Sequence, residues 1–149
     1  MHSKPIQVLL VQGANMEYLG IRQPEIYGTM ALGELHEQLI SHAKTLKILL
    51  DIRTTNLEGE AITWAYEADR KGYDAMLINP AGFTYAGYAL RDCIKALIMP
   101  TVEVHMSNIE RRGMKSVTAE ASVGVITGFG RDSYLYGLNA IVDLVKGKS

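Results

Sequence analysis

Glu103 and His105 stand two residues apart at the end of an apolar run, a spacing with direct chemical consequences. In an extended strand, residues i and i+2 point to the same side, so the carboxylate can orient the imidazole and stabilise its charged form. Such a pair is suited to general acid–base catalysis. A purely structural hydrogen bond between the two side chains is the alternative, and it stays open at this point.

A second group of polar residues follows two other apolar runs. Asn15, Arg22 and Tyr27 lie in a long polar loop, residues 12–29, and Asn79 stands directly before Pro80. Long loops of this kind are often lids or binding loops. Each residue also has a plain structural interpretation, because asparagines form turns and an arginine can be a solvated surface charge. We expect these residues to lie together at one crevice of the fold, which favours a functional site.

The elements that must position these residues alternate along the chain. Short apolar runs with β-branched residues predict strands at residues 6–11, 47–52, 75–78, 101–104 and 124–127. Apolar residues at helical spacing predict helices between and after them, at residues 32–43, 62–69, 90–97 and 135–145. Thr29 is a possible cap of the first helix.

This alternation predicts an α/β fold, since right-handed crossovers place helices on both faces of a parallel sheet. We expect a flavodoxin-like three-layer αβα sandwich with a five-stranded parallel sheet in the order 2-1-3-4-5. Ligands of such sheets bind outside the carboxyl ends of the strands, where the strand order reverses. Nothing in the sequence suggests a second domain, so residues 1–149 are expected to form one domain.

Composition narrows the range of partners. Lys and Arg number 15 and Asp and Glu 16, a net charge of −1 that offers no field for a nucleic acid or an anionic membrane. The apolar run at residues 6–11 is too short to span a bilayer. Cys93 is the one cysteine, which excludes an internal disulfide and favours a reducing cytoplasm.

Metal and cofactor sites are not expected. The four histidines are scattered along the chain and form no Cys/His cluster of metal-ligand spacing. The loop at residues 12–29 contains neither a dinucleotide fingerprint nor a P-loop motif. We therefore predict no metal and no organic cofactor.

The chain also resembles a known family in motifs that run over almost its whole length. They are RQPEIYG, INPAGFTYAGYALRDC, EVHMSNIE and GVITGFG, in family order. This pattern resembles the type II 3-dehydroquinate dehydratases of the shikimate and quinate pathways, lyases that serve aromatic amino acid biosynthesis or quinate catabolism. The resemblance implies a flavodoxin-like enzyme without metal or cofactor, assembled as a dodecamer that consists of four trimers. Its members convert 3-dehydroquinate to 3-dehydroshikimate and water through an enolate.

The resemblance also assigns catalytic roles to individual residues. Tyr27 is the implied base that removes the proton beside the ketone, with Arg22 stabilising its phenolate. Such help is needed because an isolated phenol is only about 0.1% ionised at pH 7. Asn15 would orient a water molecule or donate to the enolate oxygen. His105, oriented by Glu103, would protonate the leaving hydroxyl group.

Further residues are implied to bind the substrate. Asn79 and the backbone N–H groups of Met106 and Ser107 would hold its carboxylate. Asp92 would reach the site of a neighbouring subunit, or else be only a solvated helix charge. The loop that carries Arg22 would close over the site and exclude water.

The chain departs from the family where the far side of the substrate ring is bound. Tyr85 replaces a family histidine, Arg112 keeps one arginine position, and a second arginine has no clear counterpart, although Arg111 or Lys115 could substitute. The segment at residues 109–123 is also shortened. These changes leave three hypotheses: a dehydratase with weakened activity on 3-dehydroquinate, an enzyme for a related cyclic hydroxy-keto acid, and a non-catalytic oligomer that binds a metabolite.

Overall fold

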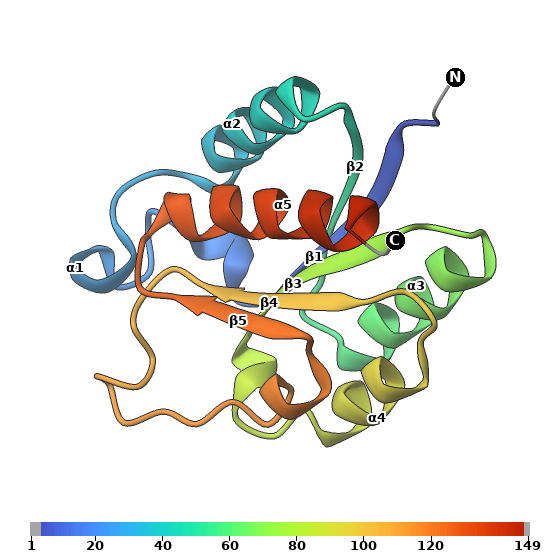
Figure 1. The fold of residues 1–149 in the computed structure, drawn as a ribbon. Coiled ribbons are helices and arrows are strands. Elements are labelled where there is room, and N and C mark those ends of the chain that lie inside the picture. The colour runs from blue at the N-terminus through green and yellow to red at the C-terminus, as the bar shows by residue number, and fades with distance from the viewer. Residues whose placement is uncertain (1–3, 148–149) are drawn as a thin grey trace.

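The computed structural model describes residues 4–147 and contains one parallel sheet at its centre (Figure 1). The strand order is β2-β1-β3-β4-β5, which confirms the predicted order and the flavodoxin-like arrangement. All four strand pairs are parallel. The strands are β1 (Ile6–Ala14), β2 (Ile48–Thr54), β3 (Ala75–Ala81), β4 (Thr101–His105) and β5 (Gly124–Thr127).

Helices cover both faces of the sheet. In Figure 1, α2 and α5 lie on one face, while α3 and α4 lie on the other. The longer helices are α2 (Leu32–Thr45), α3 (Glu58–Arg70), α4 (Tyr88–Ala96) and α5 (Arg131–Lys146). A short helix, α1 (Pro24–Tyr27), and the 3-10 turns η1 (Met16–Tyr18), η2 (Gly82–Thr84) and η3 (Ala119–Ala121) lie in the connections. Helix α2 begins after Ala31, so the suggested cap at Thr29 is wrong.

Alternate residues of the central strands belong to two separate hydrophobic cores. Val8 and Leu10 of β1 pack with α2 and α5, whereas Leu9 and Val11 pack with α3 and α4. Because successive side chains of a strand point to opposite faces, a strand buried on both faces must be apolar throughout. This explains the unbroken apolar runs and the strand assignments made from them.

The central strands extend further than their apolar runs. β1 continues to Ala14 and β3 to Ala81, so that Gln12 pairs with Asn79 across the two strands. Polar residues therefore occupy the carboxyl ends of the sheet as strand residues with fixed directions. The backbone ladder continues there because its hydrogen bonds do not depend on side-chain polarity.

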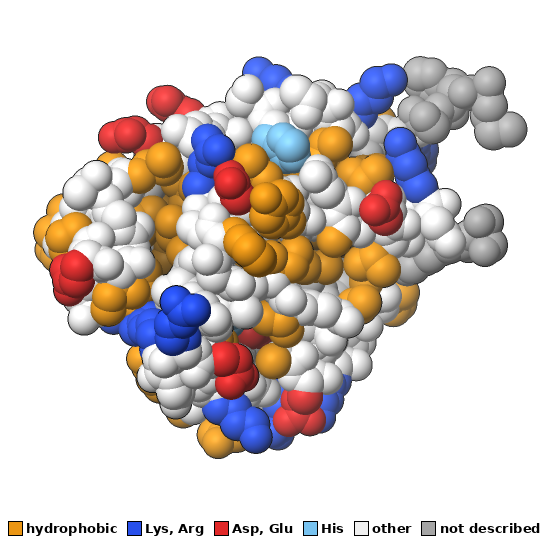
Figure 2. Space-filling view, turned by 60° about the vertical axis from the view of Figure 1, so that its left-hand side comes forward, with side chains coloured by type: hydrophobic (Ala, Val, Ile, Leu, Met, Phe, Trp, Pro, Cys, Tyr) orange, Lys and Arg blue, Asp and Glu red, His pale blue; other side chains and the backbone are white. Residues whose placement is uncertain are grey.

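The surface carries both signs of charge. Figure 2 shows basic and acidic side chains interspersed on the face that it presents, with hydrophobic side chains between them. Among residues 4–147, no helix combines the length and apolar character needed to cross a membrane.

Candidate active site

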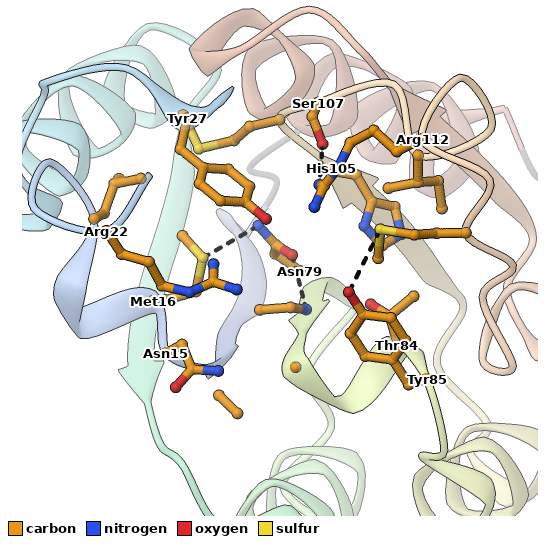
Figure 3. Close-up of a pocket in the computed structure, with 17 residues that line it drawn as sticks. Asn15, Met16, Arg22, Tyr27, Asn79, Thr84, Tyr85, His105, Ser107 and Arg112 are labelled. Carbon is orange, nitrogen blue, oxygen red and sulfur yellow. Dashed lines mark hydrogen bonds between the residues drawn. The ribbon is translucent and has the colours of Figure 1, made fainter. Parts of the chain in front are cut away.

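A cavity of about 220 Å³ opens at the carboxyl ends of β1, β3 and β4 (Figure 3). It lies between strands 1 and 3, where the strand order reverses and where the sequence placed the site. A cavity of about 150 Å³ can hold a benzene ring, so this one accommodates a substituted six-membered ring. Nine of the predicted site residues line it: Asn15, Arg22, Tyr27, Asn79, Tyr85, His105, Met106, Ser107 and Arg112.

The floor of the cavity depends on a close approach of two strand ends. A Cβ atom at Gly13 would lie 2.2 Å from the carbonyl oxygen of Pro80, so only glycine fits there. Just beyond, Asn15 and Ala81 adopt positive φ angles of 78° and 48°. Non-glycine residues with such angles are uncommon and often occur at functional sites. The backbone therefore turns sharply at the points where β1 and β3 enter the cavity wall.

The α1 loop, residues 15–28, brings two functional side chains over the cavity. Arg22 donates its backbone N–H to the Tyr18 carbonyl, and Tyr27 donates its own to Gln23. Pro24 begins α1, a position where its missing N–H has no partner to lose. Figure 3 shows the side chains of Arg22 and Tyr27 entering the cavity from this loop. The predicted loop thus contains an ordered turn that sets the direction of both.

Two guanidinium groups flank the ring of Tyr27. The Cζ atom of Arg22 lies 5.1 Å from the ring centroid, and that of Arg112 lies 5.3 Å away. Arg112 is also held by a hydrogen bond of 2.8 Å from Nη1 to Ser107 Oγ. A guanidinium group over an aromatic ring makes a favourable cation–π contact. The sequence pointed to Arg22 as the partner of Tyr27, and the structure adds Arg112.

The Glu103 and His105 side chains form a buried hydrogen-bonded pair. The distance from His105 Nε2 to Glu103 Oε2 is 2.7 Å, and Glu103 is completely buried beneath the cavity wall. Thr118, also buried, donates its hydroxyl to the other carboxylate oxygen. With Nε2 bonded to the carboxylate, Nδ1 is the ring nitrogen that can act on a molecule in the cavity. The local spacing predicted this pair, but nothing in the sequence pointed to Thr118.

Some predicted residues lie elsewhere. Asp92, on α4, is exposed and paired with Arg91, and it does not line the cavity of its own chain. Arg111 and Lys115, suggested as substitutes for a missing arginine, also do not line it. The structure adds apolar lining residues that carried no chemical signal in the sequence. They are Met16, Leu19, Ile109 and Met114.

The cavity combines an acid–base pair, a phenol between two cations, and amide and hydroxyl groups for anchoring a polar ligand. Within residues 4–147, no group of three or more histidine, cysteine or acidic side chains is arranged to bind a metal ion. The fold and the site define a doubly wound α/β protein whose small-molecule site is suited to proton transfer.

Comparison with known proteins identifies the family. The model of the family described as dehydroquinase class II matches residues 6–142, and the chain belongs to this family. A 3-dehydroquinate dehydratase of Halothermothrix orenii is 42% identical over 94% of this chain and 96% of the relative. One from Geotalea daltonii is 41% identical, covering 95% of this chain and 99% of the relative.

Solved structures agree with this assignment. The type II dehydroquinase of Propionibacterium acnes superposes with a TM-score of 0.88 at 32% identity, covering 94% of this chain and 97% of the other. A 3-dehydroquinate dehydratase-like protein from Bifidobacterium longum gives a TM-score of 0.72 at 28% identity, with 95% and 98% of the chains covered. The resemblance deduced from the motifs is thereby confirmed at the level of family and fold.

Proposed function

We propose that this protein is a hydro-lyase that converts 3-dehydroquinate to 3-dehydroshikimate and water. One observation carries the proposal: a single cavity holds Tyr27, with two guanidinium groups near its ring, together with the Glu103-bound His105. Its relatives are named for this reaction. The residue roles below are part of the proposal.

The first step is removal of a proton from the carbon beside the ketone. The Tyr27 phenolate takes this proton, and the electron pair of the broken C–H bond forms an enolate. Arg22 and Arg112 stabilise the phenolate before the transfer. Asn15, which follows the end of β1 and lines the cavity, donates to the developing enolate oxygen directly or through a water molecule.

The second step is loss of the hydroxyl group. The enolate re-forms the ketone, the new C=C bond forms, and the C–O bond breaks as His105 protonates the departing oxygen. Glu103 stabilises the imidazolium that supplies this proton and is itself held by Thr118. Tyr27 has gained one proton and His105 has lost one, so a proton exchange with water restores both for the next cycle.

The substrate carboxylate is anchored on the side of β3 and β4. Asn79 and Ser107 line the cavity there, and the backbone N–H groups of Met106 and Ser107 follow the end of β4. Arg112, bonded to Ser107, adds positive charge beside this anchor. Closure of the α1 loop over the bound substrate would exclude water from the reaction.

The test is an assay of purified protein with 3-dehydroquinate, followed by the ultraviolet absorbance of the enone product. We expect turnover that is lost in Tyr27→Phe, with the oligomeric state unchanged. Tyr18→Phe is the matched control, since Tyr18 belongs to the same loop, is exposed and does not line the cavity. Full activity in Tyr27→Phe would refute its role as the base.

A second candidate is the same reaction on a related cyclic hydroxy-keto acid. The observation that favours it is the contact of the Tyr85 hydroxyl with Met114 Sδ, at 3.6 Å, on a cavity wall where the family pattern has a histidine. A wall of phenol and thioether has less capacity to pair substrate hydroxyl groups. A kcat/KM for 3-dehydroquinate equal to that of an ordinary family member would refute this candidate.

Assembly and location complete the proposal. We infer that residues 1–149 form a single domain, supported by the one sheet and its helices on both faces. A homo-oligomer built from trimers, as a dodecamer, would give the exposed Asp92 a substrate to bind in a neighbouring site. Sedimentation of wild type and Asp92→Asn would separate a role in assembly from a role in binding. We also infer a cytoplasmic location, which the single cysteine supports.

A further inference from the structure

A chain of hydrogen bonds runs behind the cavity wall and ends at Asn79. The Asn79 Nδ2 group donates to the Tyr134 hydroxyl at 2.8 Å, and that hydroxyl donates to Gln12 Oε1 at 2.8 Å. Gln12 Nε2 lies 3.4 Å from His36 Nε2 on α2. Gln12 and Tyr134 are both completely buried and do not line the cavity. The proposed reaction leaves these two side chains without a role.

The direction of this chain is determined at one end by the backbone. Ala81 donates its backbone N–H to Asn79 Oδ1 at 3.0 Å, and a backbone N–H cannot accept in return. The Nδ2 group of Asn79 must therefore face Tyr134, and the Tyr134 proton must point to Gln12. Reversing Asn79 would set its Nδ2 group against the Ala81 N–H, and reversing Gln12 would leave the Tyr134 proton without an acceptor. Either change is costly in a buried region.

Tyr134 acts in this chain as a neutral phenol. Burial raises its pKa to about 12, although the hydrogen bonds with Asn79 and Gln12 act in the opposite direction. It therefore keeps its proton throughout the physiological range and can accept from Asn79 while donating to Gln12. The close approach of α5 makes the contact possible, since a Cβ atom at Gly137 would lie 2.7 Å from Leu77 Cδ1 on β3.

One N–H of Asn79 has only a weak partner, which a ligand in the cavity can replace. Its amide nitrogen carries two hydrogens, and Tyr134 takes one. The same nitrogen faces Met16 Sδ at 3.6 Å, a weak acceptor that itself lines the cavity (Figure 3). The oxygen of the amide is already occupied by Ala81. Asn79 is thus held as a hydrogen-bond donor toward the cavity, which suits an anionic group of the ligand.

We propose that Tyr134, together with Gln12, is a positioning residue of the active site: it fixes the Asn79 amide so that one N–H points at the substrate carboxylate. This inference rests on the proposed function, because it takes the carboxylate of that substrate as the ligand. Tyr134 touches neither substrate nor reacting atoms and acts only through Asn79. Its effect belongs to substrate binding and leaves the proton-transfer groups in place.

A double-mutant cycle tests this with Tyr134→Phe, Asn79→Ala and the combination, assayed for kcat and KM with 3-dehydroquinate. In the wild-type background, Tyr134→Phe is expected to raise KM about tenfold, the effect of one lost hydrogen bond to a charged group, with kcat changed less than about threefold. In the Asn79→Ala background the same substitution should change KM less than about twofold. An equal rise in both backgrounds, no rise at all, or a loss confined to kcat would overturn the inference.

A second variant separates positioning from loss of stability. Tyr134→Phe leaves the side-chain oxygen of Gln12, Oε1, buried without its donor. The combination of Gln12→Met with Tyr134→Phe removes this oxygen as well. The double variant should regain part of the lost melting temperature and keep the raised KM. Recovery of KM together with the melting temperature would assign the effect to stability and overturn the inference.

The wild-type measurement separates this inference from the proposed function. Turnover in the wild type supports the proposed function whatever the cycle shows. If the wild type binds 3-dehydroquinate in calorimetry without turning it over, the catalytic proposal fails, and the same cycle is judged on Kd with the same expected ratios. A wild type that neither binds nor converts 3-dehydroquinate rejects the proposed function, and this inference with it.

Discussion

Two tyrosines on opposite sides of one cavity wall have contrasting surroundings. Tyr27 lies in the α1 loop, half-buried, with the guanidinium groups of Arg22 and Arg112 over its ring. Tyr134 lies on α5, fully buried, with Asn79 and Gln12 on its hydroxyl. The first phenol lies beside two cations, whereas burial keeps the second neutral, with its pKa raised to about 12.

The same contrast extends to the regions around them. The α1 loop presents charged and exposed side chains, while the side chains behind the cavity form what we name the buried polar wall. Its members are Gln12, Asn79, Glu103, Thr118 and Tyr134. In the loop, two guanidinium groups lie close to the ring of Tyr27. In the wall, paired hydrogen bonds hold groups in one orientation, because unpaired polar atoms are costly there.

The largest effect is expected from removing the hydroxyl group of Tyr27. Tyr27→Phe should lower kcat by roughly 10²- to 10⁴-fold, the usual contribution of a general acid or base. The melting temperature should stay within about 2 °C of the wild type, because the lost hydroxyl faces the cavity and is not part of the packed core. Steady-state kinetics and thermal unfolding check the two halves. A large loss of stability would place Tyr27 with the buried polar wall.

Substitution of either arginine beside Tyr27 should lower kcat more than substitution of a surface arginine. Arg22→Gln and Arg112→Gln are each expected to lower kcat by about 10- to 100-fold, since an opposite charge within about 4–6 Å favours the anion by such factors. Arg112→Gln should also raise KM through its lost contact with Ser107. Arg111→Gln, exposed and outside the cavity, is the matched control. Equal losses in all three variants would point to a general charge effect.

Within the buried polar wall, Thr118→Val should reduce both stability and rate. The substitution leaves one oxygen of the buried Glu103 without its hydroxyl donor, at a cost of about 1–3 kcal/mol. The melting temperature should fall by about 2–10 °C, and kcat by about tenfold as Glu103 loses its fixed orientation beneath His105.

Thr101→Val provides the control for that variant. Thr101 is also a buried threonine, on β4, and its hydroxyl has no hydrogen-bond partner among the described residues. Its replacement by valine should leave rate and melting temperature close to wild type. Similar losses in Thr101→Val and Thr118→Val would mean that the effect comes from packing in β4 and its neighbours.

The smallest effect concerns His36, at the outer end of the hydrogen-bonded chain. Burial lowers the pKa of His36, so the unfolded chain binds a proton there at a higher pH than the folded one. Stability should therefore rise with pH from the lowered folded pKa up to about 6.5, the ordinary value, and be fully present above it. Urea unfolding of wild type and His36→Gln between pH 5 and 8 checks this. An identical pH dependence in both proteins would contradict it.

Local spacing in the sequence predicted much of the site. Glu103 and His105 share one side of a strand because of the two-residue period, and the structure joins them at 2.7 Å. The strand order placed the carboxyl ends of β1, β3 and β4 together, and with them Asn15, Asn79 and His105. Both inferences use regularities of the backbone, which depend little on the identity of distant side chains.

Contacts between distant segments could not be predicted in this way. Tyr134 and Gln12 are 122 residues apart in the sequence and form a hydrogen bond. This contact depends on how closely α5 approaches the sheet at Gly137. Arg112, like Arg22, lies near the ring of Tyr27. It belongs to the loop between β4 and β5, where the sequence has no periodic pattern that would predict the path of the backbone. Asp92 was expected at a substrate site, and the structure leaves it exposed and outside the cavity of its own chain.

The sequence by itself determined the α/β class, the strand order, the edge of the sheet that carries the site and the residues that line most of it. These follow from apolar periodicity, crossover handedness and motif spacing, all of which are written along the chain. Only the tertiary structure decided which tyrosine has two guanidinium groups near its ring and which is buried among amides. That difference arises from the partners that packing brings together, and burial keeps the second phenol neutral.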